Sequence, residues 1–250
     1  MEIDQLVEDL QRLGVREGGS LLVHASLRSL GEFPQRAQQV LAALKSALGA
    51  SGTLLMPALS YKTVTQEQPI FDLNATPSCV GALSEYFRTN GDALRSMHPT
   101  HSVCAWGADA AWFVEDHLQD RTPVGPHSPF SKLREAGGYL LFLGCGLRPN
   151  TSMHGVEEEV IPPYLFGSER EYSLIFSDGT VQEKRYLPHD FSGYEQRYDR
   201  LAHLLDEGEL RFGKVLRADS YLLSAKAVWE KGLEALKRDR LYFVDKITVH

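Results

Sequence analysis

Apolar side chains recur every three or four residues over residues 3–14, which predicts an amphipathic helix at the start of the chain. Two short apolar runs follow, at 20–24 and 53–57, and each has the length of a buried strand. Residues 35–48, between these runs, again repeat at helical spacing. A strand, a helix and a second strand in this order indicate two parallel strands, so the pattern predicts an α/β fold.

The alternation of strands and helices continues along the chain. Further strands are predicted at 102–106 and 139–143, and an Asp-Gly pair between two apolar runs predicts a hairpin near 171–186. Further helices are predicted at 78–88, 109–118, 131–136, 151–160, 191–207 and 220–237. Residues 60–78 have no clear period and predict a loop. Because we find no repeat and no linker, the sequence favours a single continuous domain, 1–250, with the hairpin as an insertion.

Composition and charge narrow the class of protein. The 250 residues are 43% hydrophobic and 24% charged, as in ordinary globular proteins. A net charge of −7 disfavours general nucleic-acid binding, which requires a basic face, and is compatible with a cationic substrate. The acidic start of the sequence lacks the pattern expected of a signal peptide, and no apolar run reaches the roughly 20 residues that span a bilayer, so we expect no membrane partner. Three widely spaced cysteines, Cys79, Cys104 and Cys145, indicate a reducing cytoplasm.

Polar side chains gather where the predicted strands end, which is where α/β sheets bind ligands. The turn that follows the first strand offers the Ser26 and Ser29 hydroxyls and the Arg28 guanidinium, donors that suit a phosphate group. An ordinary turn is an equally good interpretation. No glycine-rich dinucleotide or P-loop motif occurs, which disfavours a dinucleotide oxidoreductase or a P-loop nucleotide hydrolase.

Two further loops are rich in polar groups. In the segment 95–103, His98 and His101 lie three residues apart beside Ser102, a spacing compatible with metal ligands. Pro99 disfavours a regular helix there and no cysteine joins the pattern, so we predict no metal site. The alternative is that these histidines brace a loop through backbone contacts. The proline-rich loop at 123–133 is predicted to be a surface loop that ends in a helix cap.

A histidine and a carboxylate share one face of the helix predicted at 151–160. His154 and Glu157 are three residues apart, and a carboxylate on one ring nitrogen leaves the other free to accept a proton from an amine or a hydroxyl. Thr151 lies on the same face, one turn earlier. A surface ion pair is the alternative interpretation. Because helix starts shift by a residue, the spacing leaves open whether Glu157 or Glu158 orients His154.

Five motifs, in order between residues 20 and 165, resemble the aminoglycoside 3-N-acetyltransferase family. They are His24 to Gly31 (HASLRSLG), Phe71-Asp72 with Thr76-Pro77-Ser78 and Gly81-Ala82-Leu83, Arg95 to Val103 (RSMHPTHSV), Gly125 to Leu133, and Leu143-Gly144 with Asn150 to His154 and Glu157. Residues beyond 165 match only loosely. Ala25 and Leu73 stand where the family has serine and proline, and Ala25 removes one hydroxyl from the implied coenzyme site.

The resemblance implies a three-layer α/β/α fold with a central mixed sheet, distinct from the common small N-acetyltransferase fold. It implies acetyl-coenzyme A (acetyl-CoA) as the acyl donor and no metal. The implied acceptor is a cationic amine, the 3-amino group of the deoxystreptamine ring of an aminoglycoside antibiotic. An antibiotic-resistance enzyme of this kind is expected to be cytoplasmic, and a homodimer is left open.

The resemblance also implies a role for each site residue. His154 is the implied general base, Glu157 orients it, and Thr151 holds the thioester or the oxyanion. The implied coenzyme-binding residues are Ser26, Leu27, Arg28, Ser29, His98, His101, Ser102 and Val103. Direct transfer from a ternary complex is expected rather than a cysteine acyl-enzyme.

Three alternatives remain. The first is an acyl-CoA-dependent acyltransferase that acts on a metabolite amine which is not an antibiotic. The second is a coenzyme-binding protein without catalysis, which the intact His154–Glu157 pair disfavours. The third and least favoured is a metal-dependent hydrolase that uses His98, His101 and His154.

Overall fold

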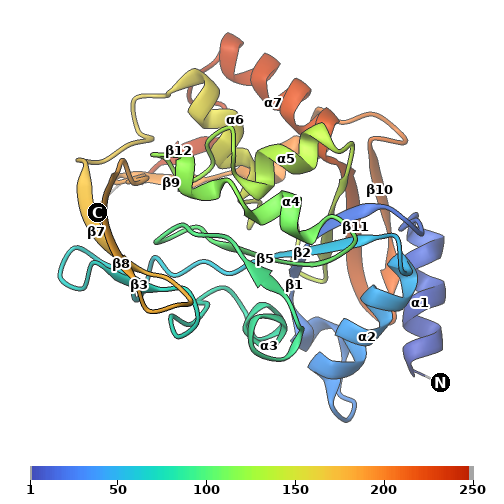
Figure 1. Cartoon of the computed structure of the whole chain (residues 1–250). Helices are drawn as coiled ribbons and strands as arrows, with labels where there is room; N and C mark the ends of the chain where they lie inside the picture. The colour runs from blue at the N-terminus through green and yellow to red at the C-terminus, as the bar shows by residue number, and fades with distance from the viewer. Residues whose placement is uncertain (1, 248–250) are drawn as a thin grey trace.

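The computed structural model describes residues 2–247 and has a seven-stranded mixed sheet at its centre (Figure 1). The strand order is β10-β11-β6-β1-β2-β5-β4. The three central strands run parallel, and they are β6 (Tyr139–Leu143), β1 (Ser20–Ala25) and β2 (Thr53–Pro57). Each remaining strand is antiparallel to its inner neighbour: β11 (Ala218–Ser224), β10 (Leu210–Val215), β5 (Val103–Gly107) and β4 (Leu94–Arg95).

Two apolar layers cover the central strands, one on each face. Along β1, Leu21 and Val23 point into one cluster of buried side chains, while Leu22 points into the other. In β6, Leu141 joins the first cluster and Leu140 the second. A strand that is buried on both faces needs an uninterrupted apolar run, which explains why β1 and β6 have this pattern rather than alternating polar residues.

The helices form the two outer layers (Figure 1). One face carries α1 (Glu2–Leu13), α2 (Arg36–Leu48) and α3 (Ala82–Asn90). The opposite face carries α4 (Ala110–Val114), α5 (Pro129–Glu135), α6 (Ser152–Val160) and α7 (Ala225–Arg238). The predicted three-layer α/β/α fold with a mixed sheet is therefore confirmed. No helix within residues 2–247 is long and apolar enough to cross a bilayer.

Two small sheets lie outside the central one. The predicted hairpin is confirmed as β7 (Arg170–Ile175) and β8 (Val181–Tyr186), which pair antiparallel, and β3 (Ile70–Asp72) extends this sheet beside β7. The other small sheet pairs β9 (Tyr194–Gln196) with β12 (Val244–Lys246). The sequence patterns did not predict β3, β9 or β12.

Three of the predicted helices are wrong in part or in full. The helix predicted at 109–118 ends at Val114 and is followed by a short 3₁₀ helix, η2 (His117–Gln119). The helix predicted at 191–207 is instead β9 and a 3₁₀ helix, η3 (Tyr198–His203), because the apolar spacing of Tyr198 and Leu201 suits a 3₁₀ turn as well as an α-helix. The helix predicted at 220–237 begins only at Ala225, where the Ser224 hydroxyl caps it. The five residues before this point lie in β11, which pairs with β6 and is part of the core.

Candidate active site

His154 lies in the wall of a cavity at the carboxyl ends of the parallel strands. The cavity has a volume of about 560 Å³. The carboxyl end of β1 and the loops that follow β2 and β6 line it, together with the start of α6 and the Tyr198 side chain from η3. Open α/β sheets bind ligands at this edge because the loops there diverge on either side of a strand. The sheet topology therefore places His154 where a substrate can reach it.

A chain of hydrogen bonds connects His154 to a buried carboxylate. The Tyr198 hydroxyl lies 2.9 Å from Nδ1 of His154 and donates to Oε2 of Glu157 over 2.8 Å. The direct separation of Nδ1 from this carboxylate oxygen is 3.4 Å. A second tyrosine, Tyr164, donates to Oε1 of Glu157 over 2.8 Å, and the Glu157 side chain is fully buried. Both carboxylate oxygens therefore have phenolic donors.

This arrangement selects one tautomer of the neutral His154 ring. A phenol has one proton, and Tyr198 gives its proton to Glu157, so its oxygen accepts a hydrogen bond from Nδ1–H of His154. Burial, together with the Glu157 charge, raises the pKa of Tyr198 well above its usual value, which keeps this phenol protonated. Nε2 of His154 is then the nitrogen with a free lone pair.

The neighbouring carboxylate points elsewhere. Oε1 of Glu158 lies 2.8 Å from Nε2 of His189 and also accepts from the Val124 backbone N–H at 2.8 Å. Burial raises the pKa of Glu158 to about 7. Of the two candidates that the helix spacing left open, Glu157 is therefore the one that connects to His154. Glu159 pairs with Arg134, so the three carboxylates do not form one open acidic surface.

The start of α6 presents polar groups to the cavity. Thr151 is the N-cap residue, but its side chain makes no capping hydrogen bond and instead lines the cavity. Asn150, also in the cavity wall, is 1% exposed, and neither its Oδ1 nor its Nδ2 has a partner within the described residues. Buried amides without partners are costly in folded proteins, so such groups are candidates for ligand contacts.

The turn predicted to bind coenzyme borders the cavity. Ala25 lines it, and the next residues form a short 3₁₀ helix, η1 (Leu27–Leu30). Arg28 and Ser29 are exposed, and the Ser29 hydroxyl donates to the Ser26 hydroxyl over 3.0 Å. Leu27 packs against the apolar layer beneath. Of this turn only Ala25 lines the cavity, and the hydroxyl and guanidinium groups follow it directly along the chain. Their coenzyme-binding role stays a prediction.

The segment 98–103 is more buried than the turn. His98, Ser102 and Val103 are at most 1% exposed. Nδ1 of His98 accepts from the backbone N–H groups of Thr100 and His101, and the Ser102 hydroxyl donates to the Ala58 carbonyl over 2.8 Å. These contacts agree with the alternative in which the histidines brace the loop through its backbone. The His101 ring lies 5.8 Å from the ring of His154. A direct role of this segment in binding the coenzyme also stays a prediction.

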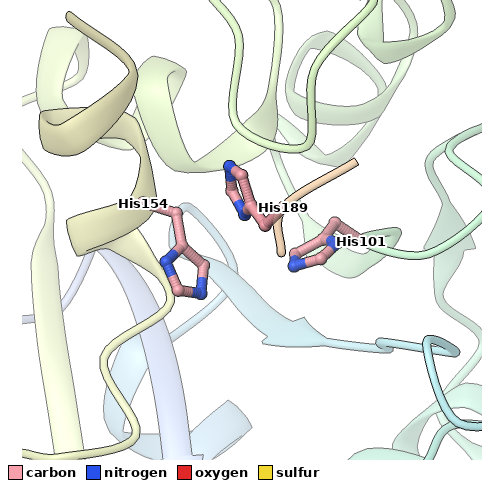
Figure 2. Close-up of side chains that lie close together, drawn as sticks. All are labelled: His101, His154 and His189. Carbon is pink, nitrogen blue, oxygen red and sulfur yellow. The ribbon is translucent and has the colours of Figure 1, made fainter. Parts of the chain in front are cut away.

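One histidine beside His154 was not predicted from the sequence. His189, from the loop after β8, places its ring 4.8 Å from that of His154 and 5.5 Å from that of His101 (Figure 2). One nitrogen from each of these rings lies within 4.8 Å of the other two, so the three rings are candidates for holding a metal ion. Burial lowers the pKa of His101 and His189 well below the usual value, so both rings are neutral at pH 7.

Comparison with known proteins agrees with this fold. A family model described as aminoglycoside 3-N-acetyltransferase matches residues 22–237. Aminoglycoside N(3)-acetyltransferase IV of Salmonella sp is 33% identical over 246 residues, which cover 96% of this chain and 89% of that protein. The solved structure of AAC-IIIb binary with CoASH has a TM-score of 0.82 at 28% identity, covering 94% of this chain and 96% of that one. A mutant of AAC(3)-IVa in complex with a gentamicin has a TM-score of 0.81 at 30% identity, covering 96% and 90%.

The fold and these matches define an acyltransferase of the three-layer α/β/α class, separate from the small N-acetyltransferase fold. The chain belongs to the aminoglycoside 3-N-acetyltransferase family. The resemblance carried by the five sequence motifs is thereby confirmed, and the matched region extends beyond residue 165, where those motifs end.

Proposed function

We propose that the protein transfers an acetyl group from acetyl-CoA to the 3-amino group of the deoxystreptamine ring of an aminoglycoside, with His154 as the general base. The observation that carries this proposal is the hydrogen-bond chain from Glu157 through Tyr198 to Nδ1 of His154. It leaves Nε2 as the proton-accepting nitrogen in the wall of the cavity. The family and the relatives with bound coenzyme or gentamicin support the class of substrates.

The base is needed because a primary amine is mostly protonated at pH 7 and attacks only after it loses a proton. His154 takes this proton at Nε2 as the amine nitrogen bonds to the acetyl carbonyl carbon. The carbon–sulfur bond then breaks, and the departing thiolate takes up a proton to give coenzyme A thiol. General-base catalysis of this kind contributes about 10²–10⁴-fold to the rate.

Direct transfer is favoured over an acyl-enzyme. Cys145 lines the cavity, but burial raises the pKa of its thiol to about 12. A cysteine reacts as the thiolate, so this one is a poor nucleophile at pH 7. Cys104 is 1% exposed, and burial raises the pKa of its thiol to about 12 as well.

The proposal assigns the two ends of the donor to two parts of the site. The exposed Arg28 and Ser29, with Ser26, would hold the pyrophosphate at the rim, because arginine and hydroxyl groups donate to phosphate oxygens. Thr151 and the unpartnered Asn150 amide at the start of α6 would face the thioester carbonyl, where negative charge develops. His98, Ser102 and Val103 would support the reactive end through His101, which they position.

The proposal also covers the organisation and location of the protein. Both apolar layers pack on the same central sheet, which supports treating residues 1–250 as one acetyltransferase domain. The cysteines are free, as expected in a reducing cytoplasm, where we place the reaction. A nucleic acid or a membrane has no part in it.

The experiment is the release of free thiol from acetyl-CoA in the presence of a panel of aminoglycosides, followed by mass spectrometry of the product. Saturable release with deoxystreptamine compounds and one added acetyl group on the 3-amino position would support the proposal. Release with metabolite amines alone would replace the acceptor but keep His154 as the base. Binding of acetyl-CoA without transfer to any amine would reject the proposed activity and favour a coenzyme-binding protein.

A further inference from the structure

Three histidine rings converge beside the cavity from three separate parts of the chain (Figure 2). His101 lies on the loop between β4 and β5, His154 on α6, and His189 on the loop between β8 and β9. Figure 2 shows the rings turned toward a common point, and one nitrogen from each lies within 4.8 Å of the others. We refer to these residues as the three-histidine cluster.

Each ring has one nitrogen that faces the other two rings, here called the inner nitrogen, and one that faces away, the outer nitrogen. A different side chain lies within hydrogen-bond distance of each outer nitrogen. Nδ1 of His101 lies 2.9 Å from the Thr100 hydroxyl, and Nε2 of His189 lies 2.8 Å from Glu158. Nδ1 of His154 lies 2.9 Å from the Tyr198 hydroxyl. Histidines that bind metals almost always engage their second nitrogen in this way, because the contact fixes the tautomer and the ring orientation.

The inner nitrogen of His189 has no partner. The His189 side chain is 4% exposed, and its Nδ1 forms no hydrogen bond within the described part of the chain. A buried nitrogen of this kind is normally paired with a protein group or with water. Its ring contacts those of His101 and His154, so the unpartnered atom belongs to the cluster rather than to a separate cavity.

We propose that the three-histidine cluster binds a transition-metal ion of the Zn²⁺ class, and that the bound ion blocks acyl transfer. Three neutral imidazoles and one open position are a common zinc environment. With metal–nitrogen bonds of about 2.0–2.1 Å, tetrahedral ligands lie about 3.3 Å apart, so the ligand nitrogens must close by at most roughly 1.5 Å. We expect side-chain rotation on metal binding to supply this movement.

The inhibitory part of the inference rests on the proposed function. The metal would occupy Nε2 of His154, which is the nitrogen that accepts the proton of the substrate amine. An imidazole bound to a metal through its lone pair cannot also act as a base. Metal binding and general-base catalysis therefore exclude each other at this atom.

The cluster differs from the group His98, His101 and His154 that the sequence suggested as a metal set. Nδ1 of His98 is occupied by two backbone N–H groups, and its ring packs against His117 and Tyr186. The third ligand is instead His189, which lies far from the other two in sequence.

The binding test uses the full chain after treatment with a chelator, with calorimetric titration of Zn²⁺ and absorption spectroscopy of added Co²⁺. We expect about one ion bound per chain, with the intense visible bands of tetrahedral Co²⁺. His189→Ala should lower Zn²⁺ affinity by at least about 100-fold. Glu158→Gln, which replaces the carboxylate acceptor of Nε2–H of His189 with a weaker neutral one, should lower it by about tenfold. The control is His203→Ala, because His203 is exposed on η3 and lies outside the cluster. The Zn²⁺ affinity of this variant should equal that of the unmodified protein.

A Co²⁺ spectrum of the unmodified protein typical of octahedral water coordination would overturn the site, whether or not the variants fold. Equal Zn²⁺ affinity of His189→Ala and His203→Ala would do the same.

The inhibition test measures thiol release at increasing Zn²⁺. At about ten times the dissociation constant, the rate should fall roughly tenfold and return after chelation. Stoichiometric Co²⁺ binding to the cluster without loss of transfer would overturn the blocking role. Because binding is read from calorimetry and spectra, a protein with no transferase activity at all would reject the proposed function while leaving the metal site testable.

Discussion

The hydroxyl of Tyr198 lies 2.9 Å from Nδ1 of His154, closer than the carboxylate of Glu157, which is 3.4 Å away. The pairing of His154 and Glu157 along one helix face is therefore completed by a tyrosine from another part of the chain. In the proposed mechanism Tyr198 is therefore a positioning residue, which sets the tautomer of His154 without contacting the reacting atoms.

Tyr198→Phe should lower kcat by about tenfold with little change in KM, because the ring still fills its buried site while Nδ1–H of His154 loses its nearer acceptor and keeps only the Glu157 oxygen at 3.4 Å. The measurement is steady-state kinetics, with kcat and KM determined separately for the amine and for acetyl-CoA. Tyr194→Phe is the matched control, because Tyr194 contacts the Tyr164 ring instead. A folded Tyr198→Phe enzyme with the kcat of the unmodified protein would refute the positioning role.

His154→Ala should reduce turnover by at least about 10²-fold while leaving the affinity for coenzyme A within a factor of a few. The reason is that the variant loses the proton acceptor but not the rim of the cavity. Thiol release and calorimetry with coenzyme A measure the two quantities separately. Near-normal turnover in a folded variant would remove His154 from the mechanism.

Arg28→Ala should raise the KM for acetyl-CoA by roughly tenfold with kcat retained, because a charge-assisted hydrogen bond to phosphate is lost at an exposed position. The effect should shrink at high salt, which screens exposed charges. Arg16→Ala is the control, since Arg16 is exposed near the start of β1 and not at the carboxyl end that borders the cavity. Equal KM values for the two variants would show that Arg28 does not meet the donor.

Acid should destabilise the protein through His117, whose pKa burial lowers to about 3. The unfolded chain binds a proton on this histidine near pH 6.5 and the folded protein does not, so the stability is full above about pH 6.5 and falls toward about pH 3. One such group changes the free energy of unfolding by up to about 1.4 kcal/mol per pH unit in this window.

His117→Gln should make the free energy of unfolding depend less steeply on pH, by up to the equivalent of one bound proton. Urea unfolding between pH 4 and pH 6.5 measures this dependence. Glutamine retains a donor for the Pro123 carbonyl and an acceptor for the Ser96 hydroxyl. The slope of His203→Ala, which changes an exposed histidine, should stay as in the unmodified protein. If the two variants have the same slope, protonation of His117 does not drive the acid response.

Local sequence could predict the parts of the site that depend on neighbours along the chain. The pattern of β1 and β6 reflects burial on both faces of the sheet, and His154 and Glu157 meet because they share one helix face. Tyr198 and His189 could not be found in this way, because they reach His154 only through tertiary packing of the segment after β8.

Local sequence also does not identify β11 as a strand. Its apolar run at Leu222 and Leu223 directly precedes α7, so the helical period read from the sequence starts too early. Only the antiparallel pairing with β6 distinguishes this strand from a first helical turn. The pairing partner lies some distance back in the chain, and a local window does not contain it.

The position of β6 between β1 and β11 has a consequence for biosynthesis. During translation β6 can pair with β1 as soon as both have emerged, but its other edge stays open until residues 218–224 leave the ribosome. At about 5–20 residues per second this interval lasts roughly 4–15 s. Throughout it an apolar strand with unpaired backbone groups is available to other nascent chains. Slow synthesis or truncation within this stretch should therefore send the protein to chaperones or aggregates rather than to a partly active enzyme.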